Sequence, residues 1–352
     1  MNIDFKYFDN QDAFLKYTNN KKSKYLVFVA FKTNIKLEDF NHKNIEIYGA
    51  IFSYIIYKNS VYHEGLISIE ITEEIDIDFI ENINNYNFNN SSFAESKSII
   101  TIFNGFSECN ETFFVKLFES IPIDTKIIGG GAGIIDDNKK KVLFNNKGFF
   151  LDSAIILSLK EKMKIASKHG WEYLSGPFIV TSSENNILKS IDYVDAFEIY
   201  RTEIKKDCGI DITKENFLDI SKNYPIGIVK YTGKNIVRDL ISFENRNLIL
   251  VNDVRVNSII NILKGKKEVL INAAKEAAKE VSNENNSFVI VFSCITRKNF
   301  LEDKFEEELD VIYSEVNSLN MIGVTTIGEI ANNGNRYINL LNKTCVIGTI
   351  WL

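Results

Sequence analysis

Apolar runs separated by short polar turns predict a chain that is rich in β-strands. Residues 26–30 are continuously apolar, which is typical of a strand buried on both faces. The same signals predict strands at residues 45–50, 52–57, 66–71, 99–103, 126–128, 141–144, 154–159, 178–181, 236–241, 247–251, 288–292, 321–324 and 344–350. Apolar residues at helical spacing predict helices at residues 113–121, 195–206, 266–281 and 301–316. This mixture indicates an α/β fold of the mixed α+β kind, with mixed sheets flanked by helices.

The order of predicted elements occurs three times along the chain. Each pass has a strand, a connection, a second strand that ends in small residues, and then a pair of strands. The small-residue steps lie at Gly49-Ala50, at residues 129–133 and at residues 325–329. Because the spacings differ, we expect degenerate internal strand-helix-strand repeats within a domain and not a solenoid.

The middle step is the most unusual stretch, because four glycines lie between an apolar run and two carboxylates at Asp136 and Asp137. Glycine permits positive φ and close approach of another backbone or a ligand. A phosphate-binding loop is one interpretation, but neither a Gly-Lys-Ser/Thr ending nor the dinucleotide-binding glycine spacing is present. We favour a tight, closely packed turn between strands. If Gly130 and Gly131 contact a ligand, they would do so through the backbone.

Composition narrows the class of protein. The chain has 352 residues, a net charge of −6 and no concentration of basic residues, so we expect no nucleic-acid partner. No apolar run is long enough to span a bilayer, and the first residues do not resemble a signal peptide. We therefore expect a cytoplasmic protein with no membrane partner. Four cysteines without a Cys-x-x-Cys pair, and only three histidines, argue against structural zinc.

A polar stretch at residues 210–223 predicts a boundary between two modules near residue 215. We therefore divide the chain into a short lead at residues 1–20 and modules at 21–215 and 216–352. No low-complexity linker separates the modules, so we expect them to pack intimately.

Several motifs, in this order, resemble the FIST family of sensory proteins, which have an N-terminal and a C-terminal FIST module. The N-terminal motifs are residues 128–133 with Asp137, and residues 195–200. The C-terminal motifs are residues 224–227, Val237-Arg238, residues 292–297, residues 328–330 and residues 342–344. One segment departs from the family pattern: the first small-residue turn, at residues 49–54, is bulkier. If that turn lines a pocket in relatives, the pocket here is smaller or filled.

The resemblance implies an intracellular sensor of bacterial signal transduction that binds an amino acid or a similar small carboxylate and is not an enzyme. Some family members bind haem and sense nitric oxide, which is an alternative. With no output domain expected in this chain, the signal would pass to a separate kinase, cyclase or chemotaxis component. The ligand-binding residues that we predict are Arg238, Cys294, Arg297, Gly328, Glu329, Asn342, Thr344, Gly130 and Gly131.

Arg238 lies within an apolar strand pattern, and a buried guanidinium must be paired. A ligand carboxylate would pair with it in bidentate geometry. The alternative is an internal pair with Glu329 or Asp239. Glu329 in turn could bind a ligand amine, or it could pair with Arg238 or Arg297.

Cys294 follows a buried strand, and Arg297 comes three residues later. A thiol activated by this cation and by a helix N-terminus would suggest a Cys-dependent transfer enzyme, whereas the alternative is a small buried hydrophobe. No other cofactor is expected unless haem binds. In that case His63 or His169 would be the axial ligand, and a surface histidine is the alternative for each.

Overall fold

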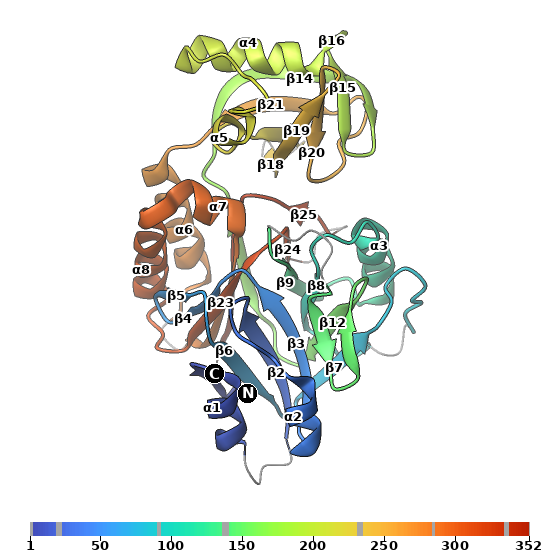
Figure 1. The fold of residues 1–352 in the computed structure, drawn as a ribbon, viewed down its shortest axis with the longest axis vertical. Helices are drawn as coiled ribbons and strands as arrows, with labels where there is room; N and C mark the ends of the chain where they lie inside the picture. Colours follow the sequence, from blue (N-terminus) through green and yellow to red (C-terminus); the bar gives the residue numbers. More distant parts are fainter. Residues whose placement is uncertain are drawn as a thin grey trace.

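The computed structural model describes residues 3–18, 23–89, 93–135, 141–230, 235–283, 286–333 and 338–351. It has a mixed α+β fold, as the sequence predicts. Figure 1 shows a lower body that contains three sheets and an upper unit that contains a fourth. The lower body holds the three predicted repeats, and the upper unit is built from residues between the second and third repeats.

Each repeat is built around a parallel pair of strands joined by a helical connection. In the first, α2 (Leu37–His42) joins β2 (Lys24–Ala30) to β3 (Glu46–Phe52). The order in this sheet is β1 (Phe5–Phe8), β6 (Leu66–Ile71), β2, β3, β10 (Leu143–Asn145) and β11 (Gly148–Phe150). The leading helix α1 (Gln11–Tyr17) follows β1.

In the second repeat, α3 (Asn110–Ser120) joins β8 (Ser98–Asn104) to β9 (Lys126–Ala132). Its sheet has the order β25 (Leu340–Leu341), β24 (Glu329–Asn332), β9, β8, β12 (Ala154–Leu159) and β7 (Ile75–Ile80). The strands expected at residues 66–71 and 154–159 therefore match β6 and β12.

In the third repeat, β22 (Asn286–Cys294) and β23 (Met321–Thr326) form the parallel pair. The connection is α7 (Ile295–Leu301), the 3-10 turn η1 (Glu302–Lys304) and α8 (Phe305–Val316), so the helix expected at residues 301–316 is interrupted near its start. The sheet order is β13 (Lys164–Lys168), β26 (Cys345–Trp351), β22, β23, β4 (Ile55–Tyr57) and β5 (Ser60–Tyr62).

The repeats exchange hairpins in a cycle. The first repeat's β4–β5 pairs with β23, the second repeat's β10–β11 pairs with β3, and the third repeat's β24–β25 pairs with β9. The internal repeat is thus confirmed. Strands from another repeat pair with one edge of each parallel pair. This exchange covers strand edges that would otherwise be open to pairing with other chains.

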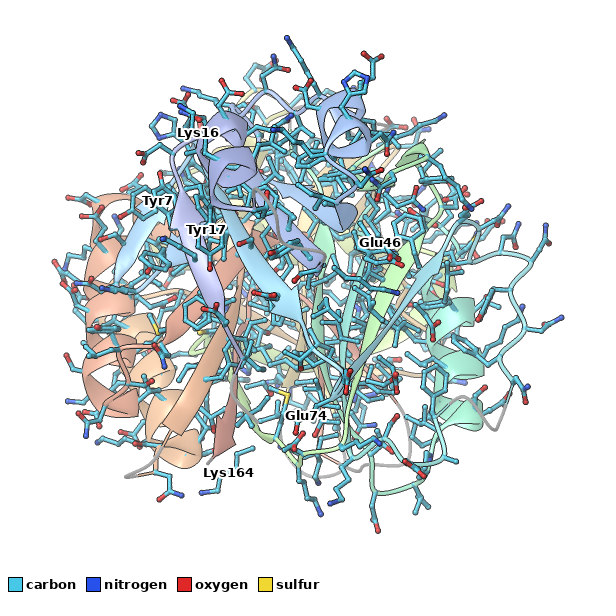
Figure 2. The ribbon with its side chains drawn as sticks, turned by 90° about the horizontal axis from the view of Figure 1, so that it is seen from below. Tyr7, Lys16, Tyr17, Glu46, Glu74 and Lys164 are labelled. Carbon is cyan, nitrogen blue, oxygen red and sulfur yellow. The ribbon has the colours of Figure 1, made fainter. Side chains whose placement is uncertain are left out.

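Alternate side chains of the parallel strands face two different cores. Leu26 and Phe28 of β2 belong to a central core shared by all three sheets, which also contains Ile102 and Phe292. Val27 and Val29 point to the opposite face of the sheet, where they pack in a second core with residues of α1 and α2. The continuous apolar runs in the sequence follow from this burial on both faces. Figure 2 views the body from below, where Lys16, Glu46, Glu74 and Lys164 are exposed.

The fourth sheet lies in the upper unit, beneath α4 (Ala196–Cys208) and beside α5 (Phe217–Ser221) (Figure 1). The chain enters it through β14 (Glu172–Glu184) and returns to the body at α6 (Lys267–Val281). The other strands are β15 (Ile187–Ile191), β16 (Val194–Asp195), β17 (Ile226–Val229), β18 (Asn235–Arg238), β19 (Leu240–Glu244), β20 (Asn247–Leu250) and β21 (Ile259–Lys264). The expected boundary near residue 215 lies between α4 and α5, and the module limits stay a prediction.

The single strand expected at residues 236–241 is wrong. Asp239 separates β18 from β19, and these strands lie at opposite ends of the sheet order. The Asp239 carboxylate accepts a hydrogen bond from Leu240 N and pairs with Lys343. A contact with a residue far along the chain therefore stabilises the break.

The turn expected at the glycine cluster is also wrong, because β9 continues through these glycines to Ala132. Close packing between strands, however, is confirmed. A Cβ atom on Gly129 would lie 2.0 Å from the backbone oxygen of Thr101, and one on Gly130 would lie 2.3 Å from Thr326 Cγ2. The carboxylates at Asp136 and Asp137 fall outside the described residues.

Candidate functional site

A cavity of about 830 Å³ lies between the lower body and the upper unit. Its body side follows the carboxyl ends of β8, β22 and β23, where ligands commonly bind in α/β sheets. The body contributes Gly105, Phe106, Ser107, Glu108, Asn110, Glu111, Thr112, Ile135, Cys294, Ile295, Thr296, Ile327, Gly328 and Asn342. The upper unit contributes Asn185, Asn186, Leu218, Asp239, Leu240, Ile241, Val251, Asn252 and Asp253.

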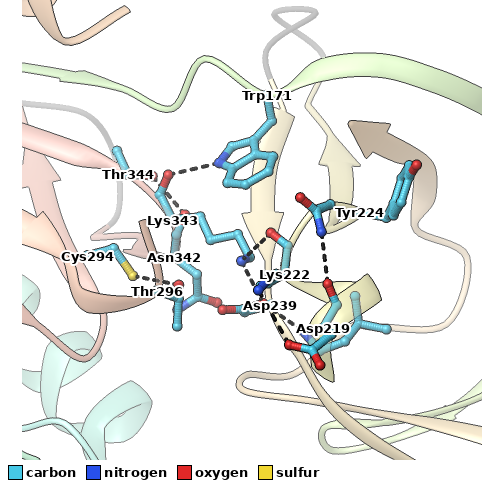
Figure 3. Close-up of polar contacts among 12 residues, drawn as sticks. Trp171, Asp219, Lys222, Tyr224, Asp239, Cys294, Thr296, Asn342, Lys343 and Thr344 are labelled. Carbon is cyan, nitrogen blue, oxygen red and sulfur yellow. Dashed lines mark hydrogen bonds and ion pairs between the residues drawn. The ribbon is translucent and has the colours of Figure 1, made fainter. Parts of the chain in front are cut away.

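Polar contacts join the two units beside this cavity, where Asp239 and Asn342 belong to its lining (Figure 3). Lys343, from the body, has no exposed side-chain surface, and its Nζ lies 3.1 Å from Asp239 Oδ1. The same Nζ donates to the carbonyl of Lys222 at 3.2 Å. Trp171 Nε1 donates to the Lys343 carbonyl at 3.1 Å. The lysine thus connects the body to two segments of the upper unit, at Lys222 and at Asp239.

Glu329 lies beside this cluster and is fully buried. Its Oε1 accepts from Thr326 Oγ1 at 2.8 Å, and its Oε2 accepts from Thr344 N at 3.2 Å. Burial raises the pKa of Glu329 to about 8, although these hydrogen bonds oppose the shift. The carboxyl group therefore holds its proton near neutral pH.

Cys294 ends β22, lines the cavity and places Sγ 3.2 Å from Thr296 Oγ1. Burial, and then the nearby Glu329, raise the pKa of the Cys294 thiol to about 12. A reactive cysteine needs the opposite shift, because the thiolate is the nucleophile. The electrostatics of this site do not favour the activation on which the transfer-enzyme alternative depends.

Arg297 is fully buried within the third repeat and is not a cavity-lining residue. Its Nε lies 2.8 Å from Glu308 Oε2, and its Nη2 lies 2.7 Å from the same oxygen. It also donates to the carbonyls of His169 and Leu270. The pairing of Arg297 with Glu329 that we considered is not formed, because Glu308 takes that place.

Arg238 is buried, as the apolar pattern around it predicts. Its guanidinium donates to the carbonyls of Asp253 at 3.2 Å, Val237 at 3.3 Å and Leu340 at 3.0 Å. Burial lowers the pKa of Arg238 to about 10, whereas the charges of Glu111 and Asp253 raise it. Arg238 lies near the acidic lining residues Glu111 and Asp253 without lining the cavity itself, and its contact with a ligand carboxylate stays a prediction.

The remaining predicted site residues divide into two groups. Gly328 and Asn342 line the cavity. Thr344 lies behind it, where its hydroxyl donates to the Asn342 carbonyl at 2.9 Å. Gly130 is opposite Glu329 in the β9–β24 register, and Gly131 N donates to the Gly328 carbonyl at 2.9 Å. The glycine strand therefore supports the cavity wall from behind.

The bulky segment at residues 49–54 runs from β3 toward Thr325 and does not line this cavity. Neither predicted haem ligand does so either. His63 is exposed, and His169 Nδ1 accepts from Trp171 N at 3.0 Å. Burial and Arg297 lower the pKa of His169 to about 4. The cavity has no histidine among its lining residues, so it does not fit haem iron with an imidazole ligand.

Sequence reasoning missed three acidic residues of the cavity lining, Glu108, Glu111 and Asp253, and also their neighbour Asn252. Glu108 and Glu111 follow the end of β8, and a polar segment after a buried strand was a usable signal. Asp253 and Asn252 follow β20 in the upper unit. Only the packing of the two units brings these four residues to one cavity.

Comparison with known proteins agrees with the resemblance seen in the sequence. The model of the FIST N domain matches residues 27–193, and that of the FIST C domain matches residues 196–332. Residues from both matched regions line the cavity. A search of curated proteins found no match. Within the described part of the chain, no helix is both long and apolar enough to cross a membrane.

Proposed function

Because the chain belongs to the FIST family, whose domains are sensory modules of signal-transduction proteins, we propose that it binds a small molecule in the cavity between its lower body and its upper unit. The ligand is an amino acid or a similar small carboxylate. Binding takes place in the cytoplasm, and the signal passes to a separate kinase, cyclase or chemotaxis component.

The observation that supports this proposal most strongly is the cavity, at about 830 Å³ and lined from both matched regions. Small-molecule sites typically have volumes of 300–1,000 Å³ and occur preferentially between domains. An amino acid carries an ammonium group and a carboxylate. Asp239 is an acceptor for the first, and the hydroxyls of Thr112 and Thr296 are donors for the second.

A binding role is also supported by the chemistry of Cys294. Its thiol is buried and its pKa is raised, so it is protonated at neutral pH. A protonated thiol can donate a hydrogen bond to a ligand, but it is a poor nucleophile. We therefore propose a sensor and not an enzyme.

Signalling requires that the ligand favour one arrangement of the body and the upper unit over another. Asp239 and Asn252 reach the cavity from the upper unit, whereas Thr296 and Asn342 reach it from the body. A ligand that contacts both sides would stabilise this arrangement of the two units. The Lys343–Asp239 contact, which joins the units without ligand, lies in the same place.

The test is a thermal-shift screen of the full chain against the twenty amino acids, followed by calorimetry. A ligand at about a hundredfold excess over its Kd is expected to raise the free energy of unfolding by about 2.7 kcal/mol. Leu218→Trp, at a cavity-lining position, should weaken binding, whereas Leu319→Trp, at another exposed leucine, should not. No shift with any amino acid would contradict the proposal.

A further inference from the structure

We propose that the ligand is an amino acid with a cationic side chain. Its ammonium or guanidinium group is held by the acidic wall of the cavity, which consists of Glu108, Glu111, Asp239 and Asp253. This inference rests on the proposed function and adds the charge of the ligand to it. Three independent features of the cavity lead to it: its charged groups, its unsatisfied acceptors and its exposed apolar residues.

The charged residues that line the cavity are all acidic. They are Glu108, Glu111, Asp239 and Asp253, and the described lining contains neither lysine nor arginine. The pKa of Glu111 is raised, chiefly by its burial and in addition by the nearby negative charge of Asp253. Carboxylates gathered in this way repel each other and a ligand carboxylate, but they attract a cation.

Nearby cations that do not line the cavity reduce the electrostatic repulsion among these carboxylates. Lys343 pairs with Asp239, and the charges of Arg238 and Arg255 act on Glu111. The two contacts of Asp239 with Lys343 Nζ and Leu240 N both involve Oδ1. The charged lining groups that a bound molecule would meet are therefore acceptors, while the hydroxyls of Thr112 and Thr296 are donors for its carboxylate.

Unsatisfied side-chain oxygens provide the second observation. Asn110 Oδ1, Asn252 Oδ1 and Asn342 Oδ1 are buried atoms without a hydrogen-bond partner among the described residues, and all three residues line the cavity. Asn110 and Asn342 are 4% and 2% exposed. Native proteins rarely leave buried polar atoms unpaired, so a donor is missing here.

The orientation of two of these amides follows from their other contact. Asn110 Nδ2 donates to the Asn104 carbonyl at 2.9 Å, and Asn342 Nδ2 donates to the Leu341 carbonyl at 3.0 Å. Flipping either amide would place its oxygen against that carbonyl. The free atoms are therefore acceptors, and an ammonium group, with three donors and no acceptor, is complementary to them.

Apolar residues complete the description of the ligand. Ile135, Leu218 and Ile241 line the cavity and are 37%, 62% and 45% exposed. Methylene groups of a ligand that cover these side chains would remove apolar surface from water, which favours binding. Lysine and arginine carry a methylene stem that ends in a cation, so they match both the apolar and the acidic parts of the wall.

Calorimetry of the full chain with L-lysine, L-arginine, norleucine and L-glutamate tests this inference. Norleucine has the methylene stem of lysine without its ammonium group. We expect L-lysine or L-arginine to bind at least tenfold tighter than norleucine, and L-glutamate to bind most weakly. Glu111→Gln and Asp253→Asn should each reduce the ratio between the cationic ligand and norleucine.

Glu73→Gln and Asp303→Asn make the same substitutions at exposed positions that do not line the cavity, and they should leave the ratio unchanged. If norleucine or L-glutamate binds as tightly as L-lysine and L-arginine, the charge inference is overturned while the proposed function stands. An unchanged ratio in both cavity variants would also overturn it. If none of the twenty amino acids binds, both proposals fail.

Discussion

Two ion pairs of the C-terminal half bury their cations completely, but they lie in different regions. Arg297 and Glu308 both belong to the third repeat, and neither side chain is exposed. Lys343 and Asp239 join the body to the upper unit, and Asp239 lines the cavity. The carboxylate of Glu308 is enclosed by protein, whereas that of Asp239 borders the cavity where we place the ligand.

This difference shows how similar chemistry can serve two purposes. A buried charge that loses its partner is costly, so the enclosed pair maintains the packing of α7 against α8. The pair at the cavity holds two units together at a place where a bound cation could compete for the carboxylate. We therefore expect the first pair to affect stability alone and the second to affect stability and binding.

The largest effect is expected from Glu308→Gln, which leaves Arg297 buried with an unpaired charge. The free energy of unfolding should fall by about 3–5 kcal/mol, measured by urea denaturation. The double variant Arg297→Met with Glu308→Leu should recover part of this loss, because no buried charge remains. Glu307→Gln, at the exposed neighbouring position, is the control. Equal losses for Glu307→Gln and Glu308→Gln would refute the distinction.

A smaller effect is expected from Lys343→Met, which retains an unbranched side chain of nearly the same length but removes its charge. We expect a loss of about 1–3 kcal/mol, because Asp239 can be hydrated through the cavity. Calorimetry should also show tighter L-lysine binding, since Asp239 would have no competing cation. Lys222→Met is the control, because Lys222 contacts Lys343 only through its carbonyl. Unchanged or weaker lysine binding would argue against the competition.

The most gradual effect is a pH dependence that arises from Glu329, because it is spread over several pH units. Burial raises its pKa to about 8, so the folded state retains a proton that the unfolded state releases above about pH 4.5. The free energy of unfolding should therefore fall as pH rises from 4.5 to 8, by at most about 1.4 kcal/mol per pH unit. Glu329→Gln should lose this part of the slope in urea denaturation at pH 5, 6.5 and 8. Identical slopes would show that Glu329 is ionised throughout.

The glycine cluster shows where prediction from sequence failed for a physical reason. Glycines between an apolar run and two carboxylates are a normal turn signal. In the structure, Gly129 and Gly130 lie within β9, because Thr101 and Thr326 approach too closely for a Cβ atom. The need for glycine comes from neighbouring strands, which a local pattern does not contain.

The candidate site was predictable only in part for the same reason. Cys294, Gly328 and Asn342 lie in motifs of the third repeat, and all three line the cavity. The partners of the two arginines were not predictable, because Arg238 contacts the Leu340 carbonyl and Arg297 contacts those of His169 and Leu270. These contacts join residues that are far apart along the chain.

Most of the elements, the threefold repeat and the family could be read from the sequence alone. Hydrophobic periodicity and turn residues act between near neighbours, so their pattern is readable without a structure. The exchange of hairpins, the pairing of Lys343 with Asp239, and the meeting of Glu108, Glu111 and Asp253 at one cavity are visible only in the three-dimensional structure. The first depends on how the repeats pack and the others on how the two units pack, and charged side chains on separate segments carry no local sign of where they will meet.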